Sequence, residues 1–330
     1  MTSRFKVLLY HPMHSEGTKL LEEKCDLVYA DSFEEEALLR KAVDVDAIII
    51  VRRGDVTRKI IESSPKLKVI GKHGVGVEKI DLLAAKQHGI SVVYTPESNY
   101  RSVAELFVTL ALMLAKKIKL GEMSCRKGHW KDDPFEFLGI DLLGKTLGIM
   151  GFGRIGKQTA RICHRGFEMP VLYFDIVSYP ETEKELHAKR VDKQQLFRES
   201  DFISINLPLV PQTRGLVNAD LIRLMKPTSF LINVARGPIW NEKDVVRALA
   251  EKKIAGAGSD VFESEPTPAN NPLFQFENFV GTPHMAAHTE ESMMRSSLVA
   301  QDILAVLEGR KPRFPVPADF YPDASKPQLT

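Results

Sequence analysis

The chain has 330 residues, 44% hydrophobic and 27% charged, as expected of a folded protein with room for two domains. Its 45 Lys and Arg residues nearly balance 43 Asp and Glu residues, and a formal charge of +2 gives no electrostatic case for a nucleic-acid partner. No apolar run approaches the roughly eighteen residues of a membrane span, and the N-terminus becomes polar too soon for a signal peptide. Three cysteines without a C-x-x-C pair suit a reducing compartment, so a cytoplasmic location is expected.

The first 98 residues alternate short apolar segments with amphipathic ones. The strands are predicted at residues 6–10, 27–29, 47–51, 67–70 and 90–94, with helices between them. The run Ala-Ile-Ile-Ile-Val at 47–51 is apolar throughout, as expected of a parallel strand covered on both faces. This alternation predicts an α/β doubly wound domain.

Residues 102–119 are predicted to form one long helix that begins at a capping box, Ser102-Val-Ala-Glu105. The segment has more apolar residues than one helix face requires. Two interpretations stay open, a core or domain-linking helix and a helix at the contact of a homodimer.

A glycine-rich turn follows the apolar run at residues 146–150, which predicts a buried strand. Gly151, Gly153 and Gly156 form the pattern G-x-G-x-x-G, and residues 157–164 continue at helical spacing. The first glycine permits a tight turn, the second lets the backbone approach a pyrophosphate, and the third lets the helix pack on the strand. The helix N-terminus then offers N–H groups to the phosphates.

An acidic residue closes the motif. A second apolar run at residues 171–174 ends in Asp175, nineteen positions after Gly156. A carboxylate there can accept hydrogen bonds from the adenosine ribose hydroxyls and repels a 2′-phosphate. The sequence therefore predicts a dinucleotide site that prefers NAD over NADP.

Three segments of the second half each follow a predicted strand, and they contain Arg236, Glu265 and His284. Taken singly, each has an ordinary explanation as a solvated turn residue, a charged loop residue or a surface histidine. Ligands of an open α/β sheet bind outside the carboxyl ends of the strands, which meet at one edge. The joint pattern therefore predicts that the three side chains converge beside a nicotinamide.

The chain resembles the D-isomer-specific 2-hydroxyacid dehydrogenase family, which includes phosphoglycerate, glyoxylate/hydroxypyruvate and D-lactate dehydrogenases. The resemblance rests on residues 71–81, 102–105, 144–156, 206–213, 233–237, 260–266 and 282–285. It implies an α/β protein of two doubly wound parallel-sheet domains with a cleft between them. A flavodoxin-like substrate domain would comprise residues 1–98 and 288–330, and a Rossmann NAD-binding domain residues 99–287.

The resemblance also implies residue roles in the NAD-dependent interconversion of a 2-oxo acid and a D-2-hydroxy acid. His284 would be the acid/base, because a histidine changes charge near neutral pH. Glu265, hydrogen-bonded to that imidazole, would favour its charged form. Arg236 would bind the substrate carboxylate and polarise the carbonyl, while the backbone N–H groups of Val75 and Gly76 would form a carboxylate-binding loop.

Further cofactor contacts follow from the same resemblance. The backbone N–H groups of Arg154 and Ile155 would bind the pyrophosphate. Pro208 and Thr213 would line the adenosine and phosphate side, and Ala235 and Asp260 would meet the nicotinamide carboxamide. No metal is expected, since His288 follows His284 at metal-ligand spacing without an evident third ligand.

The identity of the substrate stays open. Arg52, Arg53, Lys72 and His73 lie on loops that the resemblance assigns to the substrate cleft, with Arg53 as a substrate contact. These residues either bind a second anionic group or are solvated loop charges. Two alternative functions also stay open, a phosphite dehydrogenase and an NAD-responsive corepressor module, whereas Glu265 argues against formate dehydrogenases, which have glutamine there.

Overall fold

The computed structural model describes residues 4–130, 133 and 135–321, and it divides the chain into two compact units. The first unit combines residues 1–99 with residues 288–330, and the second unit comprises residues 100–287. The first unit is therefore discontinuous, because the chain leaves it after Asn99 and returns to it at His288.

The first unit has a parallel sheet of five strands in the order β2-β1-β3-β4-β5. This is the flavodoxin-like order, so the predicted fold of this unit is confirmed. All four strand pairs are parallel, as expected where helices form the connections. The strands are β1 (Phe5–Leu9), β2 (Cys25–Tyr29), β3 (Ala47–Ile50), β4 (Val69–Lys72) and β5 (Ser91–Tyr94).

Helices cover both faces of this sheet. Apolar side chains of α2, α3 and α4 form one core with the sheet, and those of α1 and α13 form the other. The two helices that close the second core come from opposite ends of the chain, and they pack against each other. The helices are α1 (Ser15–Glu22), α2 (Glu35–Ala42), α3 (Arg58–Glu62), α4 (Leu82–Gln87), α12 (Glu290–Ser297), α13 (Val299–Leu307) and the 3-10 turn η3 (Ala318–Phe320).

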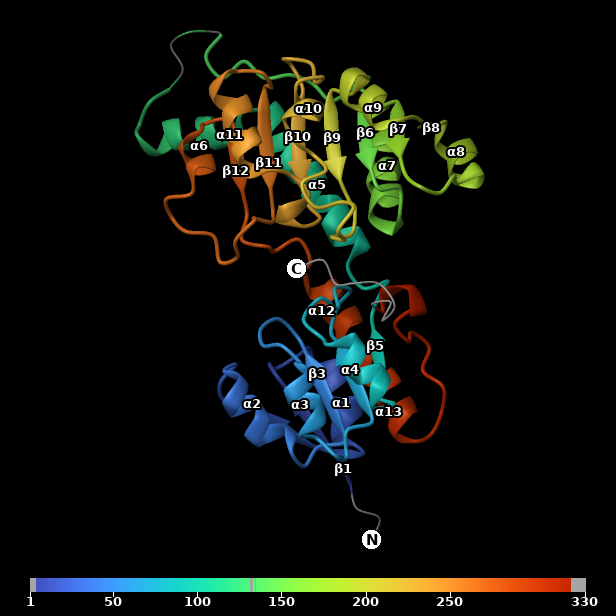
Figure 1. Ribbon diagram of the computed structural model, residues 1–330. Helices are drawn as coiled ribbons and strands as arrows, with labels where there is room; N and C mark the ends of the chain where they lie inside the picture. The colour runs from blue at the N-terminus through green and yellow to red at the C-terminus, as the bar shows by residue number, and fades with distance from the viewer. Residues whose placement is uncertain (1–3, 131–132, 134, 322–330) are drawn as a thin grey trace. The chain divides into compact units, whose positions relative to one another are not determined.

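The second unit has a parallel sheet of seven strands in the order β12-β11-β10-β9-β6-β7-β8 (Figure 1). The order reverses between β6 and β9, and this reversal is the switch point at which doubly wound folds bind dinucleotides. The predicted Rossmann topology is confirmed. The strands are β6 (Leu147–Met150), β7 (Val171–Phe174), β8 (Lys189–Arg190), β9 (Phe202–Ile205), β10 (Phe230–Asn233), β11 (Gly256–Ser259) and β12 (Phe279–Gly281).

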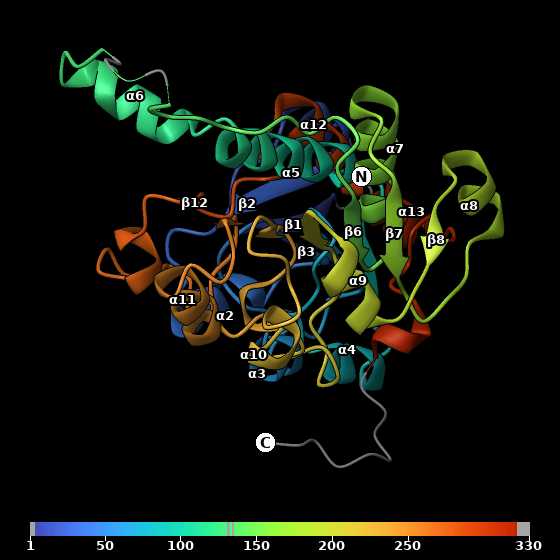
Figure 2. The same ribbon diagram turned by 90° about the horizontal axis from the view of Figure 1, so that it is seen from above.

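Two hydrophobic cores lie on the two faces of this sheet. Helices α5 and α7 cover one face, and α9, α10 and α11 cover the other (Figure 2). The helices are α5 (Tyr100–Ala115), α6 (Ile118–Arg126), α7 (Arg154–Phe167), α8 (Pro180–Leu186), α9 (Lys193–Glu199), α10 (Ala219–Ile222), α11 (Glu242–Ala250) and the 3-10 turns η1 (Gly237–Ile239) and η2 (Pro272–Gln275).

One predicted helix differs from the structure at both of its ends. The expected helix 102–119 begins at Tyr100, so buried Ser102 lies inside it and is not an N-cap. This helix ends at Ala115, because Lys117 adopts a left-handed conformation with φ of +51°. The buried face of α5 packs on α7 and on β10 to β12, which fits the interpretation as a core helix. Further along the chain, α12 and α13 follow each other directly and meet at Leu298.

Candidate active site

The predicted site residues of the second unit follow the carboxyl ends of six neighbouring strands. Because the strands are parallel, these ends lie along one edge of the sheet. From one end of this edge to the other, the residues are Asp175 after β7, Gly151 after β6, Pro208 after β9, Arg236 after β10, Asp260 and Glu265 after β11, and His284 after β12.

The glycine turn after β6 leaves no room for side chains at two positions. Gly151 has a φ of +93°, and a Cβ there would lie 2.9 Å from the backbone of Asn206. A Cβ on Gly156 would lie 2.3 Å from the carbonyl oxygen of Gly151. Gly153, in contrast, faces open space. The turn therefore packs closely at its two ends and is accessible at its centre, where a pyrophosphate would approach the backbone.

The N-terminus of α7 adds hydrogen-bond donors to this turn. Arg154 and Ile155 are the first residues of the helix, and within the described residues their backbone N–H groups have no protein acceptor. The first helical bond runs from the N–H group of Lys157 to the carbonyl oxygen of Gly153, at 2.9 Å. Open donors at the positive end of a helix dipole fit the phosphates of a dinucleotide.

Asp175 lies directly beside the glycine turn. Its Oδ2 accepts a hydrogen bond from the N–H group of Phe152 at 2.7 Å, and its Oδ1 accepts one from Val177 at 3.0 Å. A carboxylate offers about four acceptor positions, so two remain for ribose hydroxyls. The position and chemistry of Asp175 fit the predicted adenosine side of an NAD site.

The loop after β9 contains two further predicted cofactor residues. The Thr213 hydroxyl donates to the carbonyl oxygen of Pro208 at 2.6 Å and accepts the N–H group of Val210 at 2.9 Å. These bonds hold the loop in one shape next to the switch point. Pro208 is exposed and Thr213 is half-buried, so this loop presents surface to a ligand.

His284 and Glu265 form a hydrogen-bonded pair, as predicted. The Nδ1 atom of His284 lies 2.7 Å from Oε2 of Glu265, and the other carboxylate oxygen accepts the N–H group of Phe262 at 3.0 Å. Both side chains are partly exposed, at 47% for His284 and 37% for Glu265. The pairing through Nδ1 leaves Nε2 of the imidazole as the nitrogen available to a substrate.

The surroundings of Glu265 keep it ionised. Burial raises the pKa of Glu265, but the hydrogen bond and charge of His284, the Phe262 N–H group and the charge of Arg236 outweigh it, so the pKa lies below its usual range. A carboxylate that stays charged at neutral pH suits the orientation and charge stabilisation of an imidazolium.

Arg236 is brought towards this pair by close backbone packing. A Cβ on Gly237 would lie 1.9 Å from the carbonyl carbon of Phe262, so the segments after β10 and β11 touch only because residue 237 is glycine. The guanidinium Nη1 donates to the carbonyl oxygen of Ala235 at 2.7 Å. The structure thus gathers the three predicted catalytic side chains in one unit.

Two hydrogen-bonding groups that hold this site in place were not predicted from the sequence. The buried side chain of Asn233 accepts the N–H group of Ala235 at 3.0 Å and donates to the carbonyl oxygen of Arg236 at 3.0 Å. The Phe262 N–H group, described above, orients Glu265. An asparagine at a strand end shortly before the arginine is a signal that would have indicated the role of Asn233.

The first unit contains a cationic cluster at the carboxyl ends of β1, β3 and β4. Arg52 and Arg53 are exposed and make no hydrogen bond or ion pair within the described residues. The Lys72 ammonium donates to the carbonyl oxygen of Val51 at 2.8 Å. Burial and the charges of Arg52, Arg53 and Lys72 lower the pKa of His11, which shows that these groups lie near one another.

The predicted carboxylate-binding loop follows β4. The backbone N–H groups of Val75 and Gly76 have no protein acceptor within the described part of the chain. His73, in contrast, is only 6% exposed, and its Nε2 has no hydrogen-bond partner there. Burial and the neighbouring Lys72 lower the pKa of His73 to about 4. This imidazole is therefore neutral at physiological pH.

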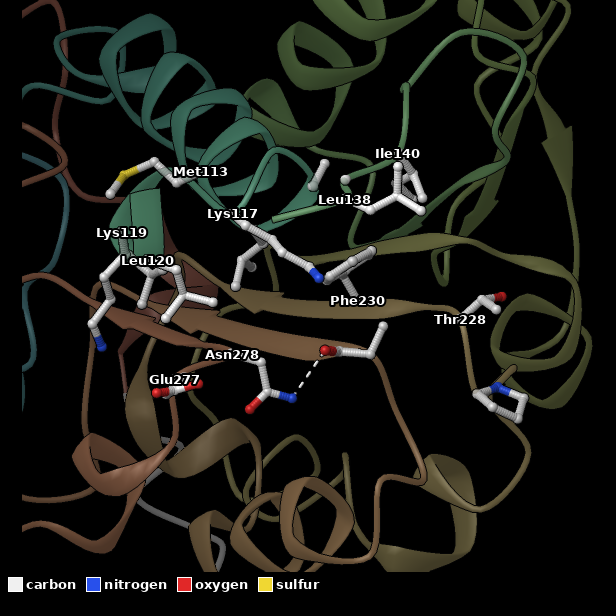
Figure 3. Close-up of a pocket in the computed structure, with 16 residues that line it drawn as sticks. Met113, Lys117, Lys119, Leu120, Leu138, Ile140, Thr228, Phe230, Glu277 and Asn278 are labelled. Atoms are coloured by element: carbon white, nitrogen blue, oxygen red, sulfur yellow. Dashed lines mark hydrogen bonds between the residues drawn. The ribbon is translucent and has the colours of Figure 1, made fainter. Parts of the chain in front are cut away.

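A cavity of about 270 Å³ lies at the opposite edge of the second unit's sheet (Figure 3). Phe230, Ala255 and Asn278, at or just before the first residues of β10, β11 and β12, line it together with apolar residues such as Leu120 and Ile140. The strands separate this cavity from the edge that carries Arg236, Glu265 and His284. It is therefore not the site of the predicted chemistry.

Neither a metal site nor a membrane span is found in the part of the chain that the structure describes. Among these residues, no three His, Cys, Asp or Glu side chains are grouped so that they could hold a metal ion. The described helices are also too short or too polar to cross a bilayer.

Comparisons with known proteins agree with this arrangement. The family model described as the NAD binding domain of D-isomer specific 2-hydroxyacid dehydrogenases matches residues 108–286. A D-3-phosphoglycerate dehydrogenase of Methanocaldococcus jannaschii is 40% identical over 92% of this chain, which spans 58% of that protein's length. A glyoxylate reductase of Thermofilum pendens is 37% identical over 94% of both chains. The crystal structure of D-lactate dehydrogenase from Aquifex aeolicus, complexed with NAD and lactic acid, has a TM-score of 0.82 and 28% identity, and the match covers 92% of this chain and 96% of that chain.

Proposed function

The chain belongs to the D-isomer specific 2-hydroxyacid dehydrogenase family and contains its NAD binding domain, and from this premise we propose that it interconverts a 2-oxo acid and a D-2-hydroxy acid. The observation that carries the proposal is the 2.7 Å pairing of His284 with an ionised Glu265 at the edge where the strands end. Such a pair supplies the proton that reduction of a carbonyl requires.

The reaction needs a hydride at C2 and a proton on the carbonyl oxygen. When bound, NADH would supply the hydride as the two-electron donor and would leave as NAD⁺. His284 donates the proton from Nε2, the nitrogen that is not paired with Glu265, and the product is the 2-hydroxy acid. Glu265 holds the imidazole in this orientation and stabilises its charged form, while Arg236 binds the substrate carboxylate and polarises the carbonyl. In the reverse direction, neutral His284 accepts the hydroxyl proton.

The residues at the strand ends fit NAD. The open centre of the glycine turn at Gly153 and the unpartnered N–H groups of Arg154 and Ile155 suit a pyrophosphate. We assign the adenosine ribose to Asp175, whose charge disfavours the 2′-phosphate of NADP. The remaining proposed contacts are Pro208 and Thr213 on the adenosine and phosphate side, and Ala235 and Asp260 beside the carboxamide. A higher kcat/KM with NADPH than with NADH would contradict the role of Asp175.

We assign the first unit the role of substrate domain. The open N–H groups of Val75 and Gly76 suit a carboxylate, and Arg53 adds positive charge at the same sheet edge. Arg52 and Arg53, which make no ion pair within the described residues, favour an anionic substrate over a neutral one. A comparison of KM for phosphohydroxypyruvate and for glyoxylate in Arg53→Ala decides whether a second anionic group is bound.

The direct test is NADH oxidation by the purified protein with a panel of 2-oxo acids. The panel comprises glyoxylate, hydroxypyruvate, phosphohydroxypyruvate, pyruvate, oxaloacetate and branched 2-oxo acids. We expect turnover with at least one of them and formation of the D-isomer, which chiral chromatography of the product identifies. NADH binding without turnover on any of these acids would contradict the proposal and favour the NAD-responsive binding module. NAD⁺ reduction by phosphite alone would favour the phosphite dehydrogenase.

A homodimer is proposed from the surface of the second unit. Helix α6 has no buried side chain and extends away from the sheet of its unit (Figure 2). The large apolar side chains exposed in this region are Ile118, Met123, Trp130, Phe135, Leu138, Ile140 and Leu143. Large exposed apolar side chains gathered in one region are typical of a protein interface. Light scattering at micromolar concentration should give the mass of a dimer, and a monomer would refute this assignment.

A cytoplasmic location is also part of the proposal. The cysteines Cys25, Cys125 and Cys163 are all free thiols, which suits a reducing compartment. Fractionation of cells that produce the protein should place it with cytoplasmic markers.

A further inference from the structure

Asp260 binds both flanks of the turn that carries His284. Its Oδ1 accepts the Thr282 hydroxyl at 2.6 Å and the N–H group of Met285 at 2.8 Å, and its Oδ2 accepts the N–H group of Ala286 at 2.9 Å. The backbone carbonyl of Asp260 also accepts the N–H group of His284 at 2.8 Å. One residue therefore holds the chain before, at and after the proposed acid/base.

The turn requires such an anchor because its backbone is strained. His284 has a φ of +52°, in the left-handed region that residues with a Cβ rarely occupy. A strained conformation persists only when the surrounding structure fixes it. Asp260 is itself fixed, since it follows β11 directly, is 1% exposed and donates its N–H group to the carbonyl oxygen of Asn233 at 3.0 Å.

The carboxylate is well suited to this arrangement. Three donors converge on it, and an ionised carboxylate is the side chain that only accepts hydrogen bonds. Asparagine has the same shape but presents an NH2 group to at least one of the donors. Within the described residues no cation pairs with Asp260, so its buried charge is compensated by these N–H and O–H groups alone.

We infer that Asp260 is a positioning residue: it sets the backbone of the His284 turn and thereby aligns the imidazole with Glu265 and the substrate. This inference rests on the proposed function and adds to the proposed place of Asp260 beside the carboxamide. Asp260 exerts this effect through the Thr282 hydroxyl and two backbone N–H groups. Its loss therefore changes proton transfer as well as any binding of the cofactor.

Substitution of Thr282 tests this role without altering Asp260. Thr282→Val keeps the volume and removes the donor to Oδ1, while Thr282→Ser retains the donor. We expect Thr282→Val to lower kcat at saturating NADH by about tenfold, the effect of one lost charge-assisted hydrogen bond. The alkaline limb of 2-oxo acid reduction should also move to lower pH, because the imidazole pairs less well with Glu265. Thr282→Ser should restore both properties.

A second pair of variants separates positioning from stability. Asp260→Asn should lower kcat more than Thr282→Val does. Asp302→Asn is the matched control, because Asp302 is also buried and accepts two backbone N–H groups, from Arg313 at 2.5 Å and Phe314 at 3.2 Å. It should lower the thermal midpoint and leave kcat and the pH profile near parental values. Circular dichroism, which does not depend on the cofactor site, verifies that each variant is folded, and fluorescence titration measures NADH binding separately.

The outcomes also distinguish this inference from the proposed function. If the parent enzyme reduces a 2-oxo acid and Thr282→Val matches it in kcat and in pH profile, the positioning role is wrong and the function stands. A weaker binding of NADH in Asp260→Asn at unchanged kcat would leave Asp260 with the cofactor contact alone and would also refute the inference. A parent enzyme without turnover refutes the proposed function itself.

Discussion

The carboxyl-end edges of the two sheets contain imidazoles in opposite states. In the second unit, His284 is partly exposed, is paired with Glu265 and lies on a turn held by Asp260. In the first unit, His73 is buried, has a pKa lowered to about 4, and has an Nε2 without a partner in the described residues. The pairing of His284 through Nδ1 leaves its Nε2 to meet a substrate, whereas burial keeps His73 neutral.

The charged side chains at the two edges also differ in whether hydrogen bonds to the protein fix them. The charged side chains of the second unit's site are hydrogen-bonded to the protein, so their geometry is set before a ligand arrives. Arg52 and Arg53 of the first unit have no such partner in the part of the chain described by the structure. The comparison teaches that proton transfer needs a fixed geometry, whereas the attraction of an anion needs only uncompensated positive charge. The following predictions test this distinction.

Removal of the paired imidazole should have the largest effect. His284→Ala should lower the turnover of 2-oxo acid reduction by about 10²-fold or more, the scale of a general acid. His88→Ala, which removes an exposed histidine that follows α4, is the control and should retain parental turnover. Steady-state kinetics at saturating NADH measures both, and a turnover within a few-fold of the parent in His284→Ala would refute the role of this residue.

The buried imidazole should affect stability and its dependence on pH. Since the pKa of His73 is lowered to about 4 in the folded protein, only the unfolded chain takes up a proton between pH 6.5 and 4. The free energy of unfolding should therefore decrease as the pH falls through this window, by about 2 kcal/mol between pH 7 and pH 5. His73→Asn should lose less stability over the same range. Urea unfolding at the two pH values tests this, and equal losses in both proteins would contradict the burial of a neutral His73.

Neutralisation of the carboxylate should change the pH dependence of catalysis. Glu265 has a lowered pKa and is charged at neutral pH, where it favours the protonated imidazole that reduction requires. In Glu265→Gln the alkaline limb of reduction should move to lower pH, with a turnover about tenfold lower near pH 8. The acid limb of hydroxy acid oxidation should also move to lower pH. Identical profiles for parent and variant would exclude the pair from the mechanism.

Removal of one unpaired cation should have the smallest effect. Arg53→Ala should raise KM for an anionic substrate by about fivefold with little change in kcat, and more at low salt. Phosphohydroxypyruvate has a second anionic group and glyoxylate does not. If Arg53 binds that group, Arg53→Ala raises KM for phosphohydroxypyruvate alone. Arg58→Ala, in which the residue lost is paired with Glu62, is the control. Unchanged KM for both acids would identify Arg53 as a solvated loop residue.

Much of the fold was predictable because parallel strands are apolar over their whole length. The strands β3, β6 and β7 lie within one residue of the predicted segments, and the glycine turn follows β6 as expected. The helix ends were less predictable. The end of α5 depends on a left-handed Lys117, and neither glycine nor proline marks that position in the sequence.

The site was predictable as a set of strand ends but not as a set of contacts. Arg236, Glu265 and His284 were expected together because carboxyl ends share an edge. The hydrogen bonds by which Asn233 and Asp260 hold the site depend on the exact path of the loops, which hydrophobic periodicity does not determine. For the same reason His73, which follows a lysine in a polar segment, was grouped with loop charges although it is buried.

The return of the chain to its first unit has a consequence for synthesis. The last core helix of this unit, α13, covers the sheet with Val299 and Ile303, and Ile303 packs against Gly71. Roughly 200 residues separate this helix from β5, so at translation rates of about 5 to 20 residues per second the nascent sheet waits roughly 10 to 40 s for its cover. During that interval α1 alone covers this face of the sheet, while the residues of the second unit can already fold.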